Sequence, residues 1–121
     1  MILPPPQQVF LCTPGSVEDE VLTIIQQRFR EPHLLKSEVL ADVSRGNAQR
    51  ADRFIVEHGY YHLVNMFRLE YARLYKKKHP ESIQDLVAFE SGFTSRVTFY
   101  KAKKSVGDIF PEVSSRVAEM F

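Results

Sequence analysis

Two short amphipathic segments joined by a single glycine constrain this chain more than any other feature of its sequence. The first, residues 82–90, ends just before Gly92, and Ser95 then opens a second segment that is rich in Lys and Arg. A serine at this position can accept a hydrogen bond from a backbone N–H of the first helical turn. Two helices joined by a short glycine-containing turn form a helix-turn-helix, whose second helix fits a DNA major groove. The stretch 82–111 therefore predicts a helix-turn-helix.

A second copy of this pattern lies about 47 residues earlier in the chain. Ala41 corresponds to Ala88, and Asn47 corresponds to Ser95. Asn is also a good N-cap residue, because its side-chain oxygen can accept a backbone N–H, and we therefore expect Asn47 to cap the helix that follows it. Two copies are too few for a solenoid, so the repeat predicts two helix-turn-helix units.

Hydrophobic residues at helical spacing, with Pro and Gly as breaks, predict seven helices and no strand, which is an all-α fold. Ser16 is the expected N-cap of the first helix, and Pro111 suits the first position of the last. The expected helices span residues 17–30, 36–44, 48–57, 60–78, 82–90, 95–104 and 111–119. The side chains predicted to be core by default include Phe54, Phe67, Leu86, Phe93 and Phe99.

The expected domain organisation is an irregular N-terminal arm, residues 1–16, followed by one double helix-turn-helix domain over residues 17–121. The arm is either a loosely docked or disordered tail, or a segment whose apolar residues 9–12 dock on the domain or on a partner chain. The expected parts of the domain are a first unit over about residues 17–59, a long linker helix over 60–78, and a second unit over about 82–119.

Two groups of residues fall at the spacing of a known family. In the second helix-turn-helix they are Ala88, Gly92, Phe93, Ser95, Phe99 and Lys104. In the linker helix they are Gly59, Tyr61, Asn65, Arg68 and Ala72. Over about residues 18–117 the chain resembles the DNA-binding domain of the arabinose-regulator (AraC/XylS) family of bacterial transcription factors.

The resemblance implies a homeodomain-like fold and sequence-specific binding of double-stranded DNA as a bacterial transcription regulator. The two recognition helices would enter successive major-groove segments, about 34 Å apart. It also implies further partners, namely RNA polymerase and a sensing domain or partner chain outside this sequence. Arg68 matches the family's linker arginine, and we expect it to have a structural role, bonding helix ends or neighbouring carboxylates.

Residue-by-residue matching also implies which side chains contact DNA bases. Gln can pair with adenine and Arg with guanine, Asp can accept from cytosine N4, and Val can contact a thymine methyl group. For Arg53 the other interpretation is a solvated helix face, with an i,i+4 pair to Glu57. The candidate base contacts are Gln49, Asp52 and Arg53 in the first recognition helix, and Arg96 and Val97 in the second.

Candidate phosphate contacts lie at the starts of the recognition helices and along the second one. Hydroxyl groups and helix N-terminal amides donate to phosphate oxygens, and lysines supply positive charge. For the lysines, a soluble helix surface is the other interpretation. The candidates are Asn47, Thr94, Ser95, Tyr100, Lys101 and Lys104.

Some residues depart from the family's pattern. Lys103 stands four residues after Phe99, where the resemblance implies an aromatic side chain that packs the helix into the core. In the first unit, Arg50 and Ser44 occupy positions expected to be apolar. The alternative function is therefore a degenerate helix-turn-helix domain that acts as a protein–protein interaction adaptor.

The distribution of charge agrees with a nucleic-acid partner. The whole chain has a net charge of +1. Residues 41–104, which hold both predicted recognition helices, contain twelve Lys and Arg against seven Asp and Glu, a net charge of +5. Positive charge is therefore concentrated where the DNA-contacting elements are expected.

Other functional classes have little support in the sequence. Cys12 is the only cysteine, so no internal disulfide can form, which favours a reducing cytoplasm. No apolar run is long enough to predict a membrane span, and the start of the chain lacks the basic segment of a signal peptide. His58 and His62 are separated by Gly59 and lack a third ligand, so we expect no metal. No catalytic pattern is present, and we expect neither an enzyme nor a cofactor.

Overall fold

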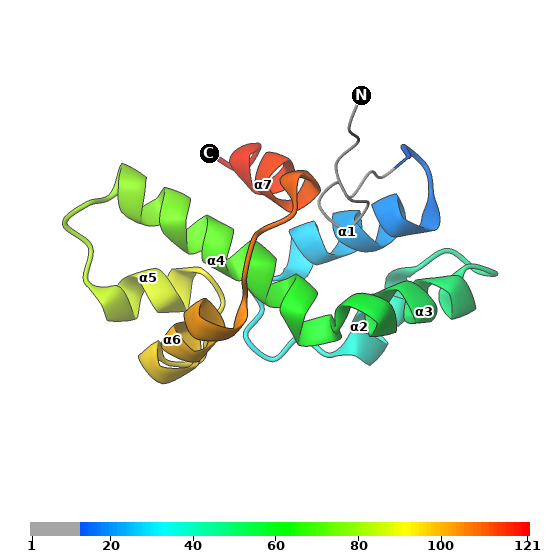
Figure 1. Ribbon diagram of the computed structural model, residues 1–121, viewed down its shortest axis with the longest axis horizontal. Coiled ribbons are helices and arrows are strands. Elements are labelled where there is room, and N and C mark those ends of the chain that lie inside the picture. Colours follow the sequence, from blue (N-terminus) through cyan, green and yellow to red (C-terminus); the bar gives the residue numbers. More distant parts are fainter. Residues whose placement is uncertain (1–12) are drawn as a thin grey trace, which may run out of the picture.

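The computed structural model describes residues 13–121, and within this range the protein consists of seven α-helices and no strand (Figure 1). The all-α prediction is confirmed. Residues 1–12, which include Cys12 and most of the predicted arm with its apolar patch, lie outside the described residues. The helices are α1 (Val17–Arg28), α2 (Lys36–Asp42), α3 (Ala48–His58), α4 (Tyr60–Lys78), α5 (Gln84–Glu90), α6 (Arg96–Ser105) and α7 (Pro111–Ala118).

Local sequence signals determine several of the helix ends. The Ser16 side chain accepts a hydrogen bond from the Asp19 N–H at 3.1 Å, so Ser16 caps α1 as predicted. Pro111 is the first residue of α7, a position where the N–H has no acceptor within the helix and the fixed φ of proline is compatible with a helix. The bounds of α4 are those predicted, whereas α1 and α2 each end two residues early. At α2 the cause is the extended backbone of Val43, with ψ at 145°.

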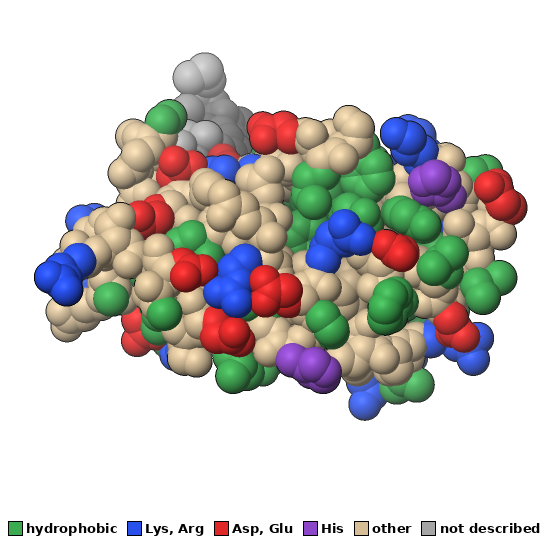
Figure 2. Space-filling view, turned by 180° about the vertical axis from the view of Figure 1, so that it is seen from behind, with side chains coloured by type: hydrophobic (Ala, Val, Ile, Leu, Met, Phe, Trp, Pro, Cys, Tyr) green, Lys and Arg blue, Asp and Glu red, His purple; other side chains and the backbone are tan. Residues whose placement is uncertain are grey.

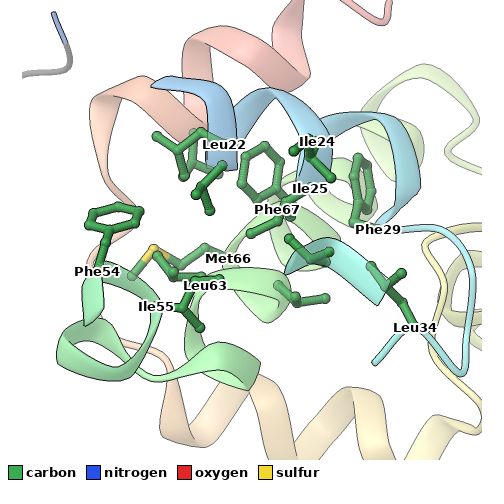
Figure 3. Close-up of a cluster of buried hydrophobic side chains, with 14 of the residues drawn as sticks. Leu22, Ile24, Ile25, Phe29, Leu34, Phe54, Ile55, Leu63, Met66 and Phe67 are labelled. Carbon is green, nitrogen blue, oxygen red and sulfur yellow. The ribbon is translucent and has the colours of Figure 1, made fainter. Parts of the chain in front are cut away.

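Most of the hydrophobic core lies between α1, α2, α3, α4 and α7. Figure 3 shows the labelled side chains of α1, α3 and α4 pointing toward one another. Phe67 of α4 is fully buried, and its ring centroid lies 5.6 Å from that of Phe29. Phe54 of α3 is also buried, so both Phe54 and Phe67 are core residues as predicted. Burying a side chain of this size stabilises the fold by roughly 1.5–3 kcal/mol.

A smaller hydrophobic cluster joins α5 and α6 to α4. The ring centroids of Phe93 and Phe99 are 5.2 Å apart, and Val87 and Ala88 pack with them, which confirms both aromatic residues as core. The prediction that Leu86 is core is wrong, because its side chain is 40% exposed. Val87 and Ala88 form the inward face of the short α5 helix, and Leu86 lies on its outer side.

The C-terminal helix packs with the first unit rather than with the second. Val113 and Val117 of α7 are fully buried in the larger cluster, where α7 contacts α4 and α1. Arg116 of α7 also forms an ion pair with Asp19 of α1. The predicted extent of the second unit, residues 82–119, stays a prediction, and α7 packs with α1 and α4, which are remote from it in the sequence.

The two units meet at the end of α1. Arg68 of α4 is 7% exposed, and its guanidinium donates hydrogen bonds to the carbonyl oxygens of Phe29 and Glu31, each at 2.8 Å. The structural role expected for Arg68 is confirmed. Arg30 donates to the backbone carbonyl of Glu90 at 2.7 Å and pairs with its carboxylate at 2.8 Å. These bonds connect the end of α1 to both α4 and α5.

The turn between α5 and α6 passes very close to the same segment. Gly92 in this turn has a φ of +101°, a conformation that residues with a Cβ rarely adopt. A Cβ at this position would lie 2.5 Å from the carbonyl oxygen of Phe29 and 2.8 Å from the Cα of Arg30. Gly92 therefore allows the second unit to dock against the first.

We predict that Gly92→Ala destabilises the protein much more than Gly46→Ala. Both glycines have positive φ, but a Cβ at Gly46 would meet nothing within 4 Å. Gly46→Ala should cost about 1 kcal/mol for its conformation alone, whereas Gly92→Ala should cost roughly 3 kcal/mol because the packed backbones must also separate. Urea denaturation measures both values, and equal losses would contradict the close approach at Gly92.

Candidate nucleic-acid interface

The first turn of α6 is ordered by a reciprocal pair of side-chain hydrogen bonds. Ser95 Oγ accepts from the Thr98 N–H, and Thr98 Oγ1 accepts from the Ser95 N–H, both at 3.2 Å. This capping box confirms the prediction that Ser95 is an N-cap. The N–H groups of Arg96 and Val97, the first two residues of α6, have no acceptor within a helix. They lie at the positive end of the helix dipole, which suits an anion such as phosphate.

The predicted contact residues of α6 are all on the surface. Val97 is 60% exposed, Tyr100 is 42% exposed, and Lys101 and Lys104 are exposed as well. The ten residues of α6 include four cationic side chains and no carboxylate. Thr94, just before the helix, is also exposed. The helix α6 therefore presents positive charge and an accessible N-terminus together.

Arg96 has one acidic neighbour, which sequence reasoning did not identify. Its Nε lies 3.5 Å from Oδ1 of Asp85 in α5, and the two side chains are 59% and 65% exposed. An exposed pair at this distance contributes little to stability. Asp85 does place a negative charge beside the first turn of α6, so a phosphate bound there would compete with Asp85 for Arg96.

The predicted first recognition helix, α3, carries three candidate base contacts. Gln49 and Arg53 are exposed, as residues that face a groove must be. Asp52 is half-buried, and its Oδ1 lies 3.0 Å from Nζ of Lys36 in α2. This ion pair joins the two helices of the first unit and neutralises Asp52. A base contact by Asp52 stays a prediction, and it would require the pair to open.

Asn47 does not cap α3, so this prediction is wrong. Its φ and ψ are −101° and −5°, and its side chain makes no capping hydrogen bond. The pKa of Glu20 in α1 lies below its usual value, mainly because the Ser44 hydroxyl donates a hydrogen bond to its carboxylate. The Ser44 N–H and the Asn47 side chain lower this pKa further, by smaller amounts. The backbone of Asn47 is in the helical region, whereas an N-cap residue typically has extended angles. Its side chain lies near the carboxylate of Glu20 in α1. That carboxylate also disfavours a phosphate at Asn47.

The candidate residues form two groups rather than one cluster. Figure 1 shows α2 and α3 toward one end of the long axis and α5 and α6 toward the other, with α4 running between them. In the same view α1 and α7 lie above α4, on the side away from α6. The opposite face, in Figure 2, mixes basic and acidic side chains, and hydrophobic ones gather on the half that carries α5.

Sequence reasoning missed the charged partners of two candidates, namely Asp85 for Arg96 and Lys36 for Asp52. Each partner lies on another helix, and no fixed spacing connects it to the residue it contacts. One signal in the sequence could have identified these ion-pair partners, namely that the two helices of a predicted helix-turn-helix pack against each other. An exposed carboxylate on one helix and a cation on the other can therefore meet, as in both units here.

Other kinds of site find no support in residues 13–121. No group of three or more His, Cys, Asp or Glu side chains in this range is placed to hold a metal ion. None of the helices described here has both the length and the apolar character needed to cross a membrane. Comparisons with protein-family models, with curated proteins and with solved structures found no match to this chain.

We predict that Ser95→Ala destabilises the protein by about 1 kcal/mol, because the Thr98 N–H loses its acceptor at the start of α6. Thr94→Ala is the matched control, since Thr94 is exposed and its hydroxyl reaches only Thr98 Oγ1 at 3.5 Å. The control should change the free energy of unfolding by less than about 0.5 kcal/mol. Denaturant titration of both variants tests this, and losses of similar size would show that Ser95 is not the cap.

Proposed function

We propose that this protein binds double-stranded DNA sequence-specifically, as a bacterial transcription regulator of the AraC/XylS type. The observation that carries the proposal is the surface of α6, where an accessible N-terminus is followed by exposed cations and no carboxylate. Helix N-terminal amides and lysines suit phosphates, and Arg96 and Val97 in the first turn suit base edges. Thr94, Ser95, Lys101 and Lys104 are the residues we assign to phosphates on this side.

The two recognition helices would contribute unequally. Positive charge supplies most of the affinity that does not depend on base sequence. The helix α6 carries four cations, and the carboxylate of Asp85 lies beside one of them, Arg96. α3 carries two cations and two carboxylates, so its charges balance and it attracts phosphates less than α6 does. We therefore assign affinity mainly to α6, and assign base discrimination to both helices, through Gln49 and Arg53 in α3.

The regulator would have partners beyond DNA. A protein of this type would work in the cytoplasm and engage RNA polymerase, and its signal would come from a sensing domain or a partner chain. These features follow from the family resemblance, and we assign no residue to them.

A protein–protein adaptor is the second candidate, and one observation favours it. Along α5 and at its N-cap, Ile83, Leu86 and Phe89 recur every three residues and are 68%, 40% and 71% exposed. An apolar face on one side of a helix suits a protein partner. This face is on α5 whereas the DNA candidates of the second unit are on α6, so separate variants can distinguish the two functions.

We predict that duplex binding weakens steeply with salt. About five phosphate contacts give a slope near −4.5 in a plot of log binding constant against log salt concentration. Lys101→Ala should make this slope shallower by about 1 and weaken all sequences alike, because it removes one phosphate contact. Lys78→Ala, an exposed lysine in the last turn of α4, is the control and should leave the slope unchanged. Negligible duplex affinity at low salt would favour the adaptor.

We predict opposite effects for Arg96→Ala and Asp85→Asn. Arg96→Ala should lower affinity for the preferred site by about 1–3 kcal/mol and relax base preference at one position. Asp85→Asn removes the charge beside Arg96 and should raise affinity for any duplex, about two- to fivefold at low salt. Selection from random duplexes, followed by equilibrium titration, measures both. If Arg96→Ala changes neither affinity nor base preference, α6 does not enter the groove.

A further inference from the structure

A cleft with a volume of about 390 Å³ lies between α4, α5, α6 and the segment that leads to α7. This volume is in the range of pockets that hold small molecules. Neither Arg96 nor Lys101 lines it, so it is distinct from the candidate DNA surface. Its hydrophobic walls are formed by Leu69, Ala72, Val87, Phe99 and Ile109.

Charged side chains of mostly one sign line the same cleft, namely Arg73, Lys76 and Lys103, with Glu70 as the acidic residue among them. Arg73 donates to both carboxylate oxygens of Glu70, at 2.7 and 3.1 Å, and holds the pKa of Glu70 below its usual value. The charge of Glu70 is therefore balanced by Arg73. Lys76 donates to the backbone carbonyl of Ser82 and keeps further N–H groups for a ligand.

Lys103 supplies a cation at the edge of the cleft. It occupies the position at which the family resemblance implies an aromatic side chain packed into the core. Instead, the Lys103 side chain is exposed, and its Nζ lies 5.3 Å from the centroid of the Phe99 ring. Lys103 thus brings a cation to the edge of a cleft whose hydrophobic wall includes Phe99.

We propose that this cleft binds a small amphiphilic monocarboxylate, such as a medium-chain fatty acid. The aliphatic part would lie against Leu69, Val87 and Phe99, which removes apolar surface from water. The carboxylate would accept hydrogen bonds from Lys76 and Lys103, and such charge-assisted bonds are stronger than neutral ones. The ligand would connect α6 to α4 and so stabilise the second unit.

Octanoate is the probe for this site, titrated into the isotope-labelled full chain without DNA. The result is then independent of whether the protein binds DNA. Amide chemical-shift changes should cluster around the cleft, with a Kd on the order of 0.1–1 mM for a ligand of about ten non-hydrogen atoms. Lys103→Met keeps the length of the side chain and removes its charge, and it should weaken binding at least about fivefold. Lys101→Met, exposed on α6 outside the cleft, should leave the Kd unchanged.

Octanol separates the charge from the apolar contact. It should bind the same cleft more weakly than octanoate, and Lys103→Met should not change its Kd, because octanol carries no carboxylate. The proposal is overturned if Lys103→Met and Lys101→Met weaken octanoate equally. It is also overturned if the shift changes centre on Ile83 and Phe89 of the exposed α5 face, or if octanoate shows no saturable binding.

Discussion

The buried guanidinium of Arg68 is the interaction on which the rest of the structure depends. The end of α1 leaves carbonyl groups inside the protein, and a buried carbonyl without a partner costs about 1–3 kcal/mol. From the middle of α4, Arg68 donates to the buried carbonyl of Phe29 and to the part-buried carbonyl of Glu31, both just after α1. Burial lowers the pKa of Arg68, yet an arginine remains charged in the physiological range. One cation thus holds the end of α1 against α4 and fixes the backbone on which the Gly92 turn rests.

This junction connects two hydrophobic clusters that share few side chains. Leu69 and Tyr75 of α4 pack against both clusters, and the Arg30 guanidinium lies 4.8 Å from the Tyr71 ring centroid while it bonds Glu90. Because these contacts involve backbone, aromatic and charged groups at once, the two units are held in one relative orientation. Under the proposed function, a duplex that touches both recognition helices would have to adapt to that spacing. The cost of bending would then depend on the base sequence between the two contacts.

The parts of the fold that were predictable from the sequence are those set within one helical turn. Ser16, Ser95 and Pro111 act on neighbouring backbone groups, so helix starts followed from residue type and position. Asn47 has the same local signal as Ser95, but its backbone is helical rather than extended, and its side chain makes no capping hydrogen bond. The docking of α7 and the exposure of Leu86 likewise depend on which helix face meets α4, and hydrophobic spacing does not specify that face.

For the candidate site, the surface position of the α6 residues followed from their spacing around buried Phe99. The partners of Asp52 and Arg96 did not, since these ion pairs join separate helices.

Under the proposed function, the pair between Asp52 and Lys36 would give the first unit a means of base discrimination that net charge does not reveal. While the pair is closed, the two charges cancel, and α3 neither attracts nor repels a phosphate strongly through Asp52. The side chains are 46% and 41% exposed, so opening the pair costs about 1 kcal/mol or less. Under the proposed function, a base with an amino donor in the major groove could replace Lys36 as the partner of Asp52 and release Lys36 toward a phosphate. A guanine or a thymine at the same place offers Asp52 no donor, and opening the pair would then leave a carboxylate facing acceptors. The first unit would thus select by exchange of partners, whereas the second would hold the duplex by attraction.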